Sequence, residues 1–183
     1  YANLFPGAGA EFFLALKNPA TLVPALLERA AEASYDMIMS GSSPANLRWA
    51  PVIRRVLAQV PGIALTIWCA EDLPLLWPEV IRAIAGVGAG EPLEGDYDLV
   101  GTLITEEGLA ALKAFFETHA PRRVTQRRRA TAAFLEKYAR PEELEIEIAL
   151  PGWTEALVAA MTGAYDEDCA EIAAMAGVTF LAP

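Results

Sequence analysis

The residues best suited to ligand chemistry are Lys17 and Asn18, which follow the apolar run EFFLAL at positions 11–16. This run is short and lies between Gly and Pro, a pattern typical of a buried parallel strand. Asn18 and Pro19 then match the N-cap and the first position of a helix. Because open α/β sheets bind anions at the carboxyl ends of their strands, beside helix amides, we expect Lys17 and Asn18 to contact a small anionic ligand. An ammonium group of Lys17 that only reaches out to solvent is the structural alternative.

A second group of candidates is the cluster Arg127, Arg128 and Arg129. Seven of the fourteen Lys and Arg residues lie between positions 120 and 140 beside a single acid, although the net charge of the chain is -10. An acidic body disfavours nucleic acid as a partner, whereas a local basic helix can still bind a small anion. A solvated helix face that balances the acidic body is the other interpretation.

The other reactive residue types indicate no site. Glu71 and Asp72 follow a second apolar run, 63–70, and two carboxylates could act as a general acid and base. Carboxylates that are adjacent in sequence need not converge, however, and helix capping explains Asp72. Cys69 and Cys169 have neither the number nor the spacing of a disulfide framework or a zinc site, so we interpret them as buried free thiols. The single histidine has no Cys or His neighbour, and no metal site is expected.

Apolar runs alternate with helical patterns along the chain, which favours an α/β fold. We predict a single α/β domain over 1–183, with a sheet-forming part at 1–100 and a mainly helical part at 101–183. The expected buried strands lie at 11–16, 63–70 and 178–181.

Two segments allow more than one assignment. Pro24 falls one turn after the expected helix start at Pro19, which predicts either a kink or a delayed start. The segment PEELEIEIAL, 141–150, alternates apolar and acidic residues as an exposed strand does, yet Pro141 followed by two glutamates also favours a helix start. Both assignments of this segment stay open.

The composition and the first residues of the chain predict where in the cell the protein is found. No apolar stretch reaches the roughly 18 residues of a membrane span, and the first residues, YANLFPGAGA, lack the pattern of a signal peptide. We therefore expect a cytoplasmic protein without membrane contact. The chain starts at Tyr1 without Met, so we expect a piece of something longer.

The segment EFFLALKNPATLVPALL resembles the strand-Arg-Asn/Asp-Pro-helix segment of the P-loop sulfotransferases. The likeness continues through LRWAPVIRRVLAQVP, ALTIWCAEDL and WPEVIRAIAG, and covers about residues 11–86. The whole chain, through LEGDYDL, LPGWTEALV, AYDEDCAEIAAM and GVTFLAP, more closely resembles the C-terminal part of an uncharacterised bacterial protein family related to those enzymes.

The resemblance implies a three-layer, P-loop-NTPase-like parallel sheet, truncated at its N-terminus and followed by a helix-rich C-terminal part. It also implies sulfuryl transfer from 3′-phosphoadenosine 5′-phosphosulfate, whose 3′-phosphate the family holds with an Arg and a Ser. Lys17 stands in the place of that Arg and Ala25 in the place of that Ser. The resemblance would give Lys17, Asn18 and Arg127–Arg129 the role of binding the phosphate groups of this donor.

The alternative is a non-catalytic binding or scaffold protein that retains the fold but has lost donor-binding residues. In either case the sheet would have an uncovered edge where neighbouring strands are missing. Because an open strand edge pairs readily with another chain, we also expect association into a homo-oligomer.

Overall fold

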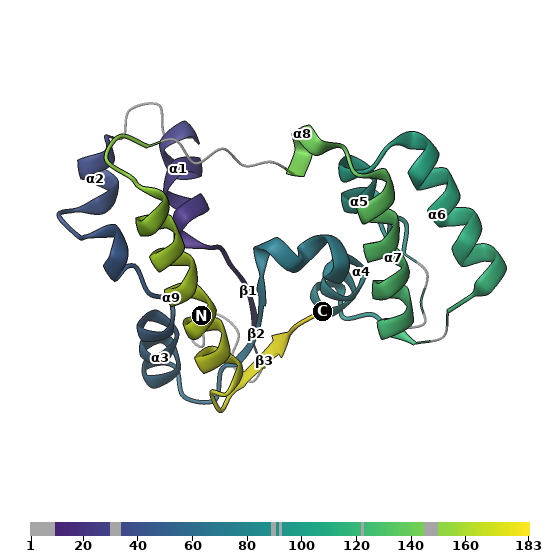
Figure 1. Ribbon diagram of the computed structural model, residues 1–183. Coiled ribbons are helices and arrows are strands. Elements are labelled where there is room, and N and C mark those ends of the chain that lie inside the picture. Colours follow the sequence, from purple (N-terminus) through teal and green to yellow (C-terminus); the bar gives the residue numbers. More distant parts are fainter. Residues whose placement is uncertain (1–9, 30–33, 89–90, 92, 122, 145–149) are drawn as a thin grey trace. The chain divides into compact units, whose positions relative to one another are not determined.

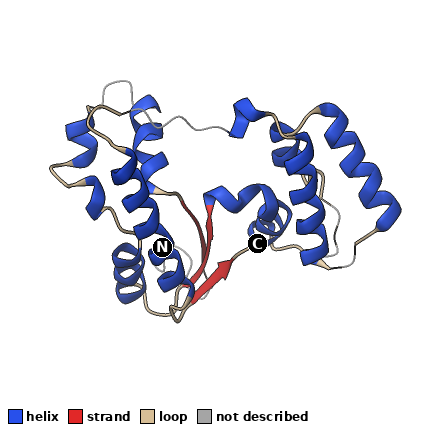
Figure 2. Ribbon diagram, viewed as in Figure 1, coloured by secondary structure: helices blue, strands red, loops and turns tan. Residues whose placement is uncertain are grey.

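The computed structural model describes residues 10–29, 34–88, 91, 93–121, 123–144 and 150–183 (Figure 1). These residues form a mixed α/β protein with a small parallel sheet and a larger share of helix (Figure 2). The chain divides into two compact units. The sheet unit comprises Tyr1–Glu71 and Ile148–Leu181, and the helix unit comprises Asp72–Glu147 and Ala182–Pro183.

The sheet unit contains three parallel strands in the order β1-β2-β3. They are β1 (Glu11–Leu16), β2 (Ala64–Cys69) and β3 (Val178–Leu181), so all three predicted strands are confirmed. In the register of the sheet, Phe13 lies opposite Thr66, and Thr66 lies opposite Thr179. Parallel strands need long crossover connections, and helices supply them here. These are α1 (Pro19–Arg29), α2 (Tyr35–Met39) and α3 (Ala50–Gln59) between β1 and β2, and α9 (Glu155–Ala173) before β3.

The core of the sheet unit forms where α3 and α9 pack against the strands. Leu16, Ile53, Ile67 and Ile172 are fully buried there. Helix α9 contacts α1, α3 and β3, so one long helix connects most elements of the unit. Its apolar spacing of three and four residues in the sequence is therefore core packing.

The helix unit consists of α4 (Leu73–Ala85), α5 (Asp98–Leu103), α6 (Glu106–His119), α7 (Val124–Tyr138) and α8 (Pro141–Leu144). Its buried core is made of Val100, Ile104, Leu112 and Phe116. Helices α6 and α7 contact each other. They approach closely at Gly108, where a Cβ atom would lie only 2.4 Å from the Cβ of Tyr138.

The structure bears on both open assignments, the helix start near Pro24 and the segment 141–150. Helix α1 begins at Pro19 and runs through Pro24, so the delayed start is wrong. Both prolines are buried, and this packing holds the helix together although Pro24 donates no hydrogen bond. The segment 141–150 begins as helix α8, Pro141–Leu144, which confirms the helix start there. Residues 145–149 lie outside the described residues.

Candidate functional site

The junction between β1 and α1 has the geometry expected for a strand-to-helix switch. The Asn18 side chain caps the helix, because its Oδ1 accepts the N–H of Ala20 at 3.0 Å. The Asn18 carbonyl accepts the N–H groups of Thr21 and Leu22, at 2.9 and 2.8 Å. Pro19 occupies the first helical position, where no N–H is needed. The predicted capping role of Asn18 is therefore confirmed.

Lys17 lies at the carboxyl end of β1 and is half-buried. Its carbonyl accepts the indole N–H of Trp49 at 2.9 Å, which fixes the backbone at this point. The Asn18 side chain continues the anchoring, because its Nδ2 donates to Oγ1 of Thr162 on α9 at 2.9 Å. These contacts hold the strand end rigidly, so the position from which the Lys17 side chain departs is well defined.

A carboxylate accepts the backbone N–H of Asn18, the residue after this lysine. Glu71 follows β2, and its Oε1 accepts the N–H of Asn18 at 2.9 Å. Its Oε2 accepts the hydroxyl of Tyr165 at 2.9 Å, and that hydroxyl also lies 3.2 Å from the carbonyl of Leu16. Glu71 itself is exposed, whereas Tyr165 is buried. Burial, followed by hydrogen bonds to Cys69 and Glu71, raises the pKa of Tyr165, so this phenol keeps its proton and donates it.

Two thiols complete the surroundings of Tyr165. Cys69 ends β2 and Cys169 lies on α9, and their Sγ atoms are 3.4 Å apart. Neither forms a disulfide, and both are half-buried. The hydrogen bond to Cys69, followed by burial, raises the pKa of Cys169.

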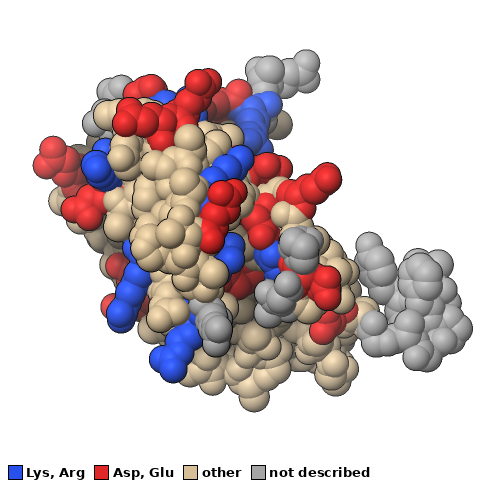
Figure 3. Space-filling view, turned by 90° about the vertical axis from the view of Figure 1, so that its right-hand side faces the viewer, with Lys and Arg blue, Asp and Glu red and all other residues tan. Residues whose placement is uncertain are grey.

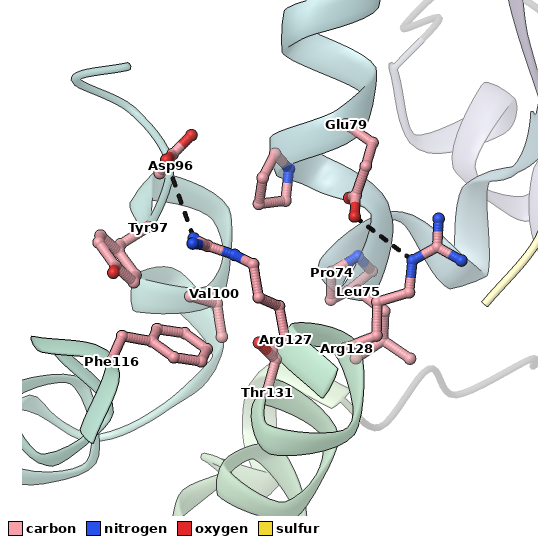
Figure 4. A pocket seen from close by; sticks show the side chains of 11 residues that line it. Pro74, Leu75, Glu79, Asp96, Tyr97, Val100, Phe116, Arg127, Arg128 and Thr131 are labelled. Carbon is pink, nitrogen blue, oxygen red and sulfur yellow. Dashed lines mark ion pairs between the residues drawn. The ribbon is translucent and has the colours of Figure 1, made fainter. Parts of the chain in front are cut away.

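The basic cluster Arg127–Arg129 lies on α7 in the helix unit, and its first two members are paired with acids. Figure 4 shows Arg127 directed toward Asp96 and Arg128 toward Glu79, with nitrogen–oxygen distances of 4.0 and 3.5 Å. The guanidinium of Arg127 also lies 5.0 Å from the ring centroid of Phe116, a cation–π contact. Arg129, by contrast, is exposed.

Several hollows touch these arginines. Three have volumes of about 240, 280 and 430 Å³ and are lined by Arg127, by Arg128 and Arg129, and by Arg129, respectively. A fourth, which Asp96 lines together with Arg127 and Arg128, is very small: its volume of about 20 Å³ is enough for roughly one water molecule. Asp96 is held there by Arg82, whose two terminal nitrogens lie 2.6 and 2.7 Å from its two oxygens. This hydrogen bonding raises the pKa of Arg82. This smallest cavity therefore has the character of a packed ion-pair cluster.

Charged side chains of both signs share the surface. Figure 3 shows one face of the molecule, on which Lys and Arg side chains lie among Asp and Glu side chains and leave a large uncharged area between them. Neighbouring charges of opposite sign reduce each other's field. On this face the basic side chains thus form no single patch.

The sequence-predicted site residues fall in both units. Lys17 and Asn18 lie at one point of the sheet unit, and Arg127–Arg129 lie in the helix unit. Sequence reasoning missed Thr162 and Tyr165 as site residues, because α9 is far from Lys17 in the chain and its apolar spacing of three and four residues is typical of core packing. It also expected Asp72 to cap a helix. Asp72 is at the N-cap of α4, but its side chain makes no capping hydrogen bond, since the helix continues there from a 3₁₀ turn, η2 (Ala70–Asp72).

Comparison of the chain with protein-family models, with curated proteins and with solved structures finds no match. In the part of the chain that the structure describes, no three His, Cys, Asp or Glu side chains are grouped so as to hold a metal ion. Within the same residues, none of the helices has the length and apolar character needed to cross a membrane.

Proposed function

We propose that the intact protein binds a phosphate group of a nucleotide sulfuryl donor, 3′-phosphoadenosine 5′-phosphosulfate, at the carboxyl end of β1, and that it acts in sulfuryl transfer. The observation that supports this proposal is the junction after β1. There Lys17 leaves a rigid strand end directly beside the N-terminus of α1. A cation next to helix amides at the carboxyl end of a parallel strand is a favourable place for phosphate.

In this proposal the fold is a three-layer, P-loop-NTPase-like one, and the sheet unit provides its strands. Lys17 contributes a point charge to the 3′-phosphate. In the reaction, the bond between sulfur and the bridging oxygen of the donor breaks, and the acceptor oxygen or nitrogen bonds to that sulfur. Adenosine 3′,5′-bisphosphate leaves, and the acceptor loses a proton.

A calorimetric titration of the full-length protein with adenosine 3′,5′-bisphosphate tests the proposal. Saturable binding to the wild type is expected, and Lys17→Ala should weaken it by about ten- to a hundredfold, since a charged hydrogen bond contributes about 1.5–3 kcal/mol. Arg55→Ala is the matched control, because Arg55 is an exposed cation on α3 of the same unit. Equal affinities of the Lys17 and Arg55 variants would remove Lys17 from the site.

A specific observation also favours the second candidate, a binding or scaffold protein without transfer chemistry. The Asn18 N–H, which a phosphate would need, already donates to Glu71. Arg127 and Arg128 are likewise paired with acids of the same unit. In this alternative the carboxylate replaces the lost ligand, and the former donor site has become a structural contact.

The variant Glu71→Ala distinguishes the two candidates. If the site still binds the donor, removal of the competing carboxylate should tighten adenosine 3′,5′-bisphosphate binding by roughly tenfold, because one or two hydrogen bonds no longer have to be displaced. If neither the wild type nor Glu71→Ala binds this nucleotide, the scaffold alternative is favoured. Circular dichroism of both proteins controls for loss of structure.

A further inference from the structure

The two cysteines lie next to each other in space although they are far apart in the chain. Cys69 is the last residue of β2, Cys169 lies on α9, and the Sγ–Sγ distance is 3.4 Å. Both side chains pack against the core of the sheet unit and remain half-buried. They are therefore in contact with each other while a small molecule can still reach them.

The groups around the pair determine which sulfur keeps its proton. The hydrogen bond to Cys69 is the largest cause that raises the pKa of Cys169, and burial and the charge of Asp166 add to it. The buried hydroxyl of Tyr165, which donates to the carboxylate of Glu71, acts in the opposite direction and lowers the pKa of Cys169, but the net shift is upward. Cys169 thus stays a thiol in contact with Cys69, which leaves Cys69 as the sulfur that reacts first.

We propose that Cys69 and Cys169 form a redox-active pair, which a hydroperoxide converts into a disulfide between the end of β2 and the C-terminal half of α9. In the first step, the Cys69 thiolate attacks the outer oxygen of the peroxide, the O–O bond breaks, and Cys69 becomes a sulfenic acid. The other peroxide oxygen takes up the proton that the Cys69 thiol has released and leaves as an alcohol, or as water when the oxidant is hydrogen peroxide. In the second step, Cys169 attacks the Cys69 sulfur, the S–S bond forms, and water leaves. Two electrons pass from the sulfurs to the peroxide, and a dithiol reductant reverses the change.

The position of this bond in the chain gives it a structural effect. The sheet unit is built from two separate chain segments, and the helix unit lies between them in sequence. Cys69 belongs to the first segment and Cys169 to the second, and their positions differ by 100. The disulfide would join both segments covalently and enclose nearly all of the helix unit in one loop. Because cross-linking so long a loop restricts the unfolded chain, the oxidised protein should melt at a higher temperature.

Peptide mapping of the unmutated full-length protein tests this proposal. The folded protein is treated with hydrogen peroxide, blocked with an alkylating reagent, digested without reductant and analysed by mass spectrometry. The expected product is one cross-linked peptide pair that contains Cys69 and Cys169, lighter by two hydrogen atoms than the separate peptides. Treatment with dithiothreitol should restore both thiols, and the cross-linked protein should have the higher melting temperature.

Two results would overturn the proposal. One is recovery of Cys69 and Cys169 as separate thiols or separately over-oxidised residues from protein whose circular dichroism is unchanged. The other is a cross-linked protein that melts below the reduced one, because the bond would then fit only a distorted chain. The variant Cys169→Ser provides a control: its Cys69 should stop at the sulfenic acid, which a dimedone probe captures, whereas the wild type should give little of this adduct.

Discussion

Replacement of Asp168 by alanine should destabilise the sheet unit strongly. Asp168 is 1% exposed on α9, and its Oδ1 accepts a hydrogen bond from Nε of Arg48 at 2.7 Å and forms an ion pair with Nη2 of the same arginine at 2.7 Å. Its Oδ2 accepts the main-chain N–H of Trp49, directly before α3. One buried carboxylate thus holds the start of α3 against α9.

The expected size of the effect follows from these contacts. Each charged hydrogen bond contributes about 1.5–3 kcal/mol, but the Arg48 side chain is 35% exposed, so water replaces much of what the arginine loses. The Trp49 N–H loses its acceptor, which costs about 1–3 kcal/mol, and removal of the buried carboxylate recovers some desolvation energy. We therefore expect Asp168→Ala to lower the free energy of unfolding by about 2–4 kcal/mol.

The neighbouring residue provides a matched control. Oε2 of Glu167 lies 3.7 Å from the same Arg48 Nη2, but its side chain is 75% exposed. Glu167→Ala should therefore change the free energy of unfolding by no more than about 0.5 kcal/mol. Urea unfolding followed by circular dichroism measures both variants, and the Asp168→Ala midpoint should fall by roughly 1–2 M at a slope of about 2 kcal/mol per molar urea. Equal effects of the two replacements would refute this account of the buried carboxylate.

Two further predictions concern the buried phenol and the helical glycines. Burial raises the pKa of Tyr165 above its ordinary 10.0, so above about pH 10 the phenol ionises in the unfolded chain before it does in the folded one. The free energy of unfolding of the wild type should therefore fall above about pH 10, by at most ~1.4 kcal/mol per pH unit from this group. The slope should be smaller in Tyr165→Phe, and identical alkaline unfolding profiles of the two proteins would contradict this. Gly108→Ala should destabilise the helix unit by about 1–3 kcal/mol, because the new Cβ would meet Tyr138 at 2.4 Å. A Cβ added at Gly163 would have no neighbour within 4 Å, so Gly163→Ala should stabilise α9 by about 0.5–1 kcal/mol. Thermal melts that rank the two alanine variants in the opposite order would be inconsistent with the packing.

The local part of the fold could be predicted from the sequence because its signals are local. A continuous apolar run followed by Asn18 and Pro19 specifies a strand, a cap and a helix start within a few residues. The same holds for the end of α4, where Gly86 adopts φ 65° as a helix-terminating glycine does. At Pro24 the sequence left a kink or a delayed start open, and only the delayed start is excluded, because burial of the helix face outweighs the local preference of proline.

The site itself could be predicted only in part, because its partners come from distant segments. Glu71 was visible as an acid at a strand end, but its contacts with Asn18 and Tyr165 depend on how β1, β2 and α9 pack. The contact between the two thiols has the same origin, since their spacing of 100 positions matches no motif. The arginine cluster shows the reverse: its charge was evident in the sequence, but its acidic neighbours Glu79 and Asp96 were not.

The most direct test of the proposed function is the preference for a 3′-phosphate. Calorimetry would compare the affinities of the full-length wild type and Lys17→Ala for adenosine 3′,5′-bisphosphate and for adenosine 5′-phosphate. If Lys17 holds the 3′-phosphate, the wild type should prefer the bisphosphate by about tenfold or more, and Lys17→Ala should lose this preference with little change in 5′-phosphate affinity. An unchanged preference in Lys17→Ala, or no binding of either nucleotide by the wild type, would contradict the proposal.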